Sequence, residues 1–229
     1  MLLIDKPKGI TSFDVIRRLR RQYTQNHIGE KAPKMGHAGT LDPLATGLML
    51  VGVGQGTKRL TGLTKLNKEY IAEVRFGMST STGDLEGEAI DEKEITAPVE
   101  KLTQQVSALI TEMVGQLTLP VSAYSAIKVD GVPMYKRARK DEKTGEVVED
   151  VPLRTMNVHS AAVLSTKIQE RYFVAEICFL VGSGTYIRSL GVELGNRLGY
   201  PATLQSLRRT KVGEFEVENA QQISDTFIY

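Results

Sequence analysis

The carboxylate of Asp42 stands at the centre of a glycine-rich segment between two apolar runs. The segment contains one histidine and reads Gly36-His37-Ala38-Gly39-Thr40-Leu41-Asp42-Pro43-Leu44-Ala45-Thr46-Gly47. One interpretation is functional: a carboxylate is held at a loop-to-helix junction, where glycines let a ligand approach the backbone closely. The same spacing is typical of a helix start, with Asp42 as the N-cap and Pro43 at the first helical position. Spacing alone leaves both interpretations open.

This segment resembles the signature of the TruB-type tRNA pseudouridine synthases, which convert a uridine in the T-arm loop (position 55) to pseudouridine. In that family the aspartate is the catalytic nucleophile, so the resemblance implies this role for Asp42. Four further segments resemble the family in the same order. The resemblance therefore covers nearly the whole chain and favours a catalytic aspartate over a simple helix cap.

A second segment with chemical side chains runs from Gly182 to Leu190. Its apolar spacing predicts a helix with Thr185 near the N-cap and Arg188 in the first turn. A cation is electrostatically unfavourable at the positive end of a helix, which suggests an anionic partner nearby. The resemblance implies that Arg188 pairs with Asp42, and that Tyr186 lines the same site.

Two aromatic residues in the matching segments are implied to contact the target base. Tyr70 begins a strand in which alternate residues share one face, a pattern typical of a core tyrosine. The resemblance instead implies that Tyr70 stacks on the base and helps to move the final proton. His37 is implied to prop or replace the base once it has been flipped out.

Two further residues are implied to bind substrate. Gly54–Lys58 is similar to a segment of the family, and the resemblance implies that Lys58 binds substrate. The glycines do not indicate a nucleoside triphosphate site, because the Walker spacing is absent. Leu207 is implied to pack on the target pocket, and Arg208 and Arg209 beside it suit phosphates.

Several residues are expected to support the site rather than react. Lys6 is either a buttress of the active-site loop, as the resemblance implies, or an exposed turn lysine. Ser12 is expected to cap a helix whose arginines lie mostly on the face opposite its apolar residues. Asp84 keeps one acidic position of the family pattern and is also explained as a turn former.

The elements predict an α+β fold. Arg154–Val163 and Tyr172–Val181 are expected to be neighbouring strands, Pro98 to start a long helix, and Val212–Val217 to form an edge strand. The resemblance implies the pseudouridine synthase fold, with a central, largely antiparallel mixed sheet, flanking helices and an RNA-binding cleft. We expect one catalytic domain over residues 1–229, with a flap-like insertion at about 120–152 and no separate C-terminal RNA-binding domain.

Composition limits the possible partners, disulfide bonds and location of the protein. The 229 residues are 41% hydrophobic and 24% charged, with a net charge of +2. Residues 1–35 carry eight Lys/Arg against three acidic residues, an excess that either tracks a phosphate backbone or is a solvated face. The single cysteine, Cys178, excludes an intrachain disulfide. No apolar run is long enough for a membrane helix or a signal peptide, so a cytoplasmic location is expected.

The expected reaction breaks the N1–C1′ bond of the target uridine and joins C5 to C1′. It involves no redox change and no hydrolysis, so we expect no cofactor and no metal. The expected partner is the T-arm stem-loop of tRNA, bound by a monomer. Two routes for Asp42 stay open: attack on C1′, as in a retaining glycosidase, or attack on C6 of the base. A non-catalytic RNA-binding or tRNA-folding protein, and a synthase acting on another RNA, are the alternative functions.

Overall fold

The computed structural model describes the chain except residues 123–127, 130, 135–150 and 224–229. Its contacts divide the chain into two compact units. Unit 1 comprises Met1–Ile71, Cys178–Ser183 and Ser206–Tyr229, and unit 2 comprises Ala72–Ile177 and Gly184–Gln205. The predicted insertion at 120–152 lies largely outside the described residues.

Unit 1 is built around strand β3, which is buried along most of its length. β3 pairs antiparallel with β1 and β2 and parallel with β12, while β14 pairs parallel with β1 and β13 antiparallel with β12. Apolar residues of β2, β3 and β12 form a core with neighbours from the following turns. The strands are β1 (Leu2–Lys6), β2 (Met35–Ala38), β3 (Thr46–Val53), β12 (Ala202–Val212), β13 (Phe215–Glu216) and β14 (Gln221–Gln222).

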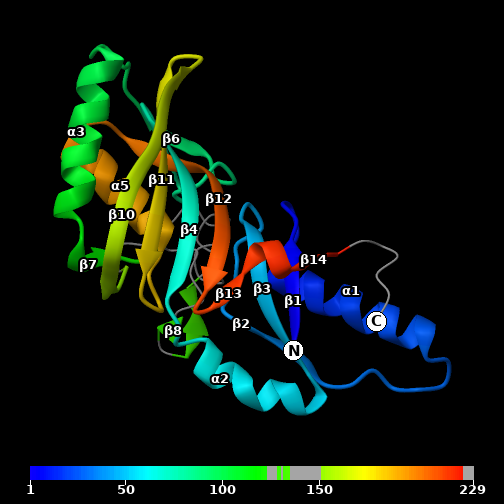
Figure 1. Cartoon of the computed structure of the whole chain (residues 1–229). Coiled ribbons are helices and arrows are strands. Elements are labelled where there is room, and N and C mark those ends of the chain that lie inside the picture. The colour runs from blue at the N-terminus through cyan, green and yellow to red at the C-terminus, as the bar shows by residue number, and fades with distance from the viewer. Residues whose placement is uncertain (123–127, 130, 135–150, 224–229) are drawn as a thin grey trace. The chain divides into compact units, whose positions relative to one another are not determined.

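Helix α1 (Ser12–Asn26) packs against β2 in unit 1 (Figure 1). Its N-cap is Thr11, whose hydroxyl accepts a hydrogen bond from Asp14 N, while the Asp14 carboxylate accepts one from Thr11 N. The prediction that Ser12 caps this helix was wrong, because the capping box begins one residue earlier. A 3-10 helix, η1 (Gly54–Arg59), and a short helix, α2 (Leu60–Leu63), follow β3, and η2 (Val217–Asn219) follows β13.

Unit 2 carries the other ends of β12 and β4, followed by the first part of β11 and by β10 and β7. Helix α3 packs on β10 and on α5, and α5 also packs on β7 (Figure 1). The bounds are β4 (Lys68–Phe76), β7 (Gly115–Pro120), β10 (Leu153–Gln169), β11 (Tyr172–Val181), α3 (Val99–Glu112) and α5 (Ile187–Leu198). Two small hairpins complete the described elements: β5 (Met78–Thr80) with β6 (Ala89–Glu92), and β8 (Lys128–Val129) with β9 (Val132–Pro133).

The alternation of apolar residues along the sequence correctly predicted which faces of two strands are buried. Tyr70 and every second residue to Phe76 are buried on β4, and Phe173 and every second residue to Val181 are buried on β11. Pro98 is the N-cap of α3, as predicted. The predicted edge strand at 212–217 was wrong: β12 ends at Val212, and only Phe215–Glu216 returns to pair with it.

The strand order is β14-β1-β3-β12-β4-β11-β10-β7, with β2 and β13 attached to β3 and β12. It contains both parallel and antiparallel pairs, and with its helices it confirms the predicted α+β class with a mixed sheet. Among the described residues, no helix has the length and apolar character needed to cross a membrane.

Candidate active site

Asp42 lies in the connection between β2 and β3 in unit 1. The two strands are antiparallel, with His37 opposite Val51 and Ala38 opposite Leu50. No helix follows Pro43; instead, Ala45 N donates a 3.1 Å hydrogen bond to Asp42 O and closes a turn. The N-cap interpretation of Asp42 was therefore wrong. The Asp-Pro pair stands in a strand-to-strand loop because residues from Thr46 onward continue directly into β3.

The loop is held on both sides of Asp42 by the last residue of β1 and the first residue of α1. Ser12 Oγ accepts a 2.8 Å hydrogen bond from Leu41 N and donates one of 2.9 Å to Leu41 O. Lys6 is fully buried, and its Nζ donates to the carbonyl oxygens of Ile10 at 2.7 Å and Pro43 at 3.3 Å. Lys6 is thus a buttress and not an exposed turn lysine. With both neighbours fixed, the backbone of Asp42 has little freedom.

Arg209 forms hydrogen bonds to the backbone at both ends of the same loop. Its Nε donates to Leu48 O at 2.7 Å and its Nη2 to Gly39 O at 3.2 Å, and the residue is 1% exposed. The prediction that Arg209 suits phosphates was wrong, because its guanidinium faces backbone carbonyls inside unit 1. Arg208, which is partly exposed, pairs with Asp5 at 2.8 Å.

Gly47 is required where the loop enters β3. Its φ is +105°, and a Cβ atom there would lie 2.2 Å from Arg209 O. The backbones of β3 and β12 meet at this point, with Gly47 paired to Arg209. Only glycine fits, because any side chain would collide with the neighbouring strand.

Arg209 also sets the electrostatics around the loop. Lys68 is buried and donates from Nζ to the carbonyl oxygens of Thr64 and Leu66, each at 2.6 Å. Burial, followed by the charge of Arg209, lowers the pKa of Lys68 to about 8. Burial lowers the pKa of His37 below its usual value, and Arg209 lowers it further. Both effects favour the neutral form of the His37 ring.

The other predicted residues of unit 1 lie on separate elements. Tyr70, on β4, and Leu207, on β12, are each 8% exposed. Lys58 is exposed on η1. Its exposure leaves its ammonium group open to an anionic ligand.

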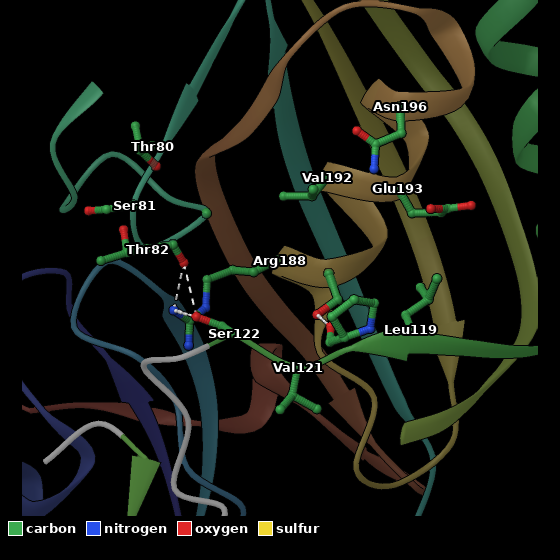
Figure 2. A pocket seen from close by; sticks show the side chains of 13 residues that line it. Thr80, Ser81, Thr82, Leu119, Val121, Ser122, Arg188, Val192, Glu193 and Asn196 are labelled. Atoms are coloured by element: carbon green, nitrogen blue, oxygen red, sulfur yellow. Dashed lines mark hydrogen bonds between the residues drawn. The ribbon is translucent and has the colours of Figure 1, made fainter. Parts of the chain in front are cut away.

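Unit 2 holds Arg188 and Tyr186, the latter as the half-buried N-cap residue of α5. Arg188 is in the first turn, as predicted, and is 6% exposed. Its Nη1 donates to Thr82 O at 2.9 Å and to Ser122 Oγ at 3.0 Å, as Figure 2 shows, and lies 3.7 Å from the carboxylate of Asp84. Within unit 2, Asp84 is an anionic partner of Arg188.

Asp84 and Ser122 contact Arg188 and were not among the predicted site residues. Thr82 Oγ1 donates to Asp84 Oδ1 at 2.6 Å, and Glu86 N donates to the same oxygen at 3.1 Å, so Asp84 does form a turn. Its other oxygen, however, faces Arg188. In the sequence, the feature that could have indicated Asp84 is that it keeps an acidic position of the family pattern, in a Thr-x-Asp turn.

A cavity of about 190 Å³ opens beside Arg188 (Figure 2). One wall carries hydroxyl groups, among them Thr82 and Ser122, and another is apolar, with Leu119 and Val192. Glu193 and Asn196 of α5 complete the polar edge. The cavity therefore offers hydrogen-bonding groups and an apolar surface to a ligand next to a buried guanidinium. Across the described residues, no cluster of His, Cys, Asp and Glu has the arrangement of a metal site.

The chain matches known proteins along nearly its whole length. Residues 25–187 match the model of the TruB family pseudouridylate synthase (N terminal domain). The tRNA pseudouridine synthase B of Leifsonia xyli subsp. xyli is 40% identical over 224 residues, which are 98% of this chain and 70% of the relative. That of Fusobacterium nucleatum is 39% identical, over 95% of this chain and 69% of the relative.

Among solved structures, a chain in the crystal structure of a Cbf5-Nop10-Gar1 complex is similar, with a TM-score of 0.66 and 26% identity. The match covers 97% of this chain and about half (51%) of the solved one. The signature loop around Asp42 lies inside the residues that the family model matches. The family model, the relatives and this fold agree, and the chain belongs to the TruB family of pseudouridylate synthases.

Proposed function

We propose that this protein is a tRNA pseudouridine synthase that isomerises the uridine at position 55 in the T-arm loop. The relatives named above are tRNA pseudouridine synthases. The observation that carries the proposal is the loop of Asp42, whose two neighbours are fixed by Ser12 and Lys6 and whose ends are fastened by Arg209. A nucleophile must be held in one geometry to react efficiently, and this loop supplies that constraint.

The reaction starts with extrusion of the target nucleotide, because a stacked base hides the glycosidic carbon. The neutral ring of His37 takes the place of the extruded base or props it, and Tyr70 stacks on the base. Lys58 and Tyr186 bind the surrounding nucleotide, and Leu207 forms an apolar wall of the target pocket.

Asp42 then attacks as a carboxylate, at C1′ of the ribose or at C6 of the base. The N1–C1′ bond breaks, the uracil turns and C5 bonds to C1′. The bond to Asp42 breaks and returns the free carboxylate, and the proton leaves C5 with the help of Tyr70 while N1 gains one. We assign Arg188 to orient Asp42 and to support the departing uracilate. Because Asp84 also faces Arg188, the guanidinium keeps a carboxylate near it when Asp42 becomes covalently bonded.

The test is incubation of the purified chain with an unmodified tRNA transcript, followed by position-resolved detection of pseudouridine. Product at position 55 is expected with the wild type. Asp42→Asn is expected to bind tRNA and form no product, and the exposed Asp91→Asn should behave as wild type. Product from Asp42→Asn would contradict the assigned nucleophile.

The same assay separates the alternatives. Binding without product in the wild type would indicate a non-catalytic RNA-binding protein, and product at another uridine would indicate another target. Equal product from an isolated T-arm hairpin would support the T-arm as the bound element. A monomer and a cytoplasmic location belong to the proposal as well; sedimentation of the chain alone and with tRNA tests the first, and imaging of the tagged protein in cells the second.

A further inference from the structure

The outer face of α1 is strongly basic and has no part in the site described above. Arg17, Arg18, Arg20 and Arg21 are all exposed on it, whereas Val15, Ile16 and Leu19 on the opposite face are buried. We propose that this arginine face binds backbone phosphates of the substrate RNA outside the target nucleotide. The proposal rests on the proposed function and names a second RNA contact of the same enzyme.

The charges on this face are only partly compensated by the helix. Arg17 pairs with Asp14, but within the described part of the chain no acidic side chain pairs with Arg18 or Arg21. Side chains three and four positions apart are neighbours on a helix, so Arg17 repels Arg21 and Arg18 repels Arg21. The last turn of α1 contains no basic residue, so these arginines do not complement the helix dipole either. An anionic partner removes this repulsion.

The first residue of α1 contacts the Asp42 loop. Ser12, the first residue of α1, is hydrogen-bonded to Leu41. With a rise of 1.5 Å per residue, the four arginines lie roughly 8–14 Å along the helix axis from that bond. An RNA strand that leaves the site along α1 therefore passes these side chains within a few nucleotides of its target.

The chemistry of the face fits RNA better than other anionic surfaces. Guanidinium groups match phosphate oxygens in a bidentate geometry. Phe13, 59% exposed at the end of α1 nearest the loop, offers a ring for stacking an unpaired base. A helix that lies on a lipid membrane needs an exposed apolar stripe, whereas the apolar stripe of α1 is buried in unit 1.

The test measures binding of an unmodified tRNA transcript at several salt concentrations, in an Asp42→Asn background. Replacing Arg18 and Arg21 with Gln should lower the slope of log K against log salt by about 1.4–1.8. The corresponding loss of affinity is roughly 25- to 60-fold at 0.1 M salt. In the active enzyme the double variant should raise KM for tRNA and leave kcat unchanged.

Lys101→Gln with Arg154→Gln is the matched control, because both residues are exposed in unit 2, and its salt slope should equal that of wild type. An unchanged slope for the Arg18/Arg21 variant overturns the proposal, as does an equal loss in the control. Binding to phosphatidylserine vesicles that depends on these arginines, with unchanged tRNA affinity, also overturns it.

The two arginines are exposed, so a melting temperature equal to wild type is expected. If the double Gln variant is unstable, Arg18→Gln and Arg21→Gln are measured singly, and each should lower the salt slope by about 0.7–0.9. Failure of this proposal leaves pseudouridine formation intact. Failure of the proposed function removes the product whatever the salt slope.

Discussion

Arg188 and Asp84 form a buried ion pair in unit 2, with 3.7 Å between Nη1 and Oδ2 and side chains that are 6% and 3% exposed. Two hydrogen bonds from the same Nη1, to Thr82 O and Ser122 Oγ, fix the guanidinium further. Leaving one charge of such a pair buried and unpartnered is costly. The position of Arg188 is therefore set by its own unit before any RNA binds.

The first prediction concerns Asp84. Asp84→Ala removes the carboxylate facing a buried guanidinium and should lower the free energy of unfolding by about 3 kcal/mol. It should also lower kcat, because Arg188 is then free to turn. Urea unfolding and single-turnover pseudouridine formation measure the two effects. Asp91→Asn, on the exposed strand β6, is the control and should change neither.

The second prediction separates positioning from RNA contact at Arg209. Arg209→Lys keeps the charge but cannot reach both Leu48 O and Gly39 O, so the Asp42 loop loosens. We expect kcat to fall by about 100-fold, with KM for tRNA and its salt dependence unchanged. Arg208→Gln, which removes the neighbouring arginine, should leave kcat near wild type. A raised KM with unchanged kcat for Arg209→Lys would mean that Arg209 binds RNA.

The third prediction concerns Gly47. Gly47→Ala places a methyl group 2.2 Å from Arg209 O at a φ of +105°. We expect a loss of about 3 kcal/mol in unfolding free energy, from backbone strain and overpacking together. Gly62→Ala on α2, where a Cβ has open space, should be neutral or slightly stabilising. Comparable melting temperatures for the two variants would contradict the close approach of β3 and β12.

The fourth prediction follows from the lowered pKa of Lys68. The pKa is about 8 in the folded protein and 10.5 ordinarily, so between these values the unfolded chain binds more protons. Stability contributed by this group therefore rises with pH from about 8 to 10.5, with a slope of at most about 1.4 kcal/mol per pH unit. Lys68→Met should lack this rise, whereas the exposed Lys65→Met should keep it. Chemical denaturation from pH 7 to 10.5 gives the difference.

The sequence was sufficient for the elements whose pattern is local. Alternation along Tyr70–Phe76 and Phe173–Val181 identified two central strands, and helical spacing identified α3 and the first-turn position of Arg188. The motif around Asp42 was specific enough to indicate the family. These features depend on residues within a few positions of one another, so one strand or one helix fixes them.

Tertiary structure alone decided how the site is supported. Arg209 looks like a phosphate ligand in the sequence, yet pairing of β12 with β3 buries it against Gly39 and Leu48, about 160 to 170 residues away. The Asp-Pro pair, which is typical of a helix start, stands instead in the loop that joins β2 and β3. Ser12, which was expected to cap α1, is hydrogen-bonded to Leu41 instead. Asp84 meets Arg188 from 104 positions away. Such pairs arise from the packing of distant segments, and a local pattern of one sequence carries no information about them.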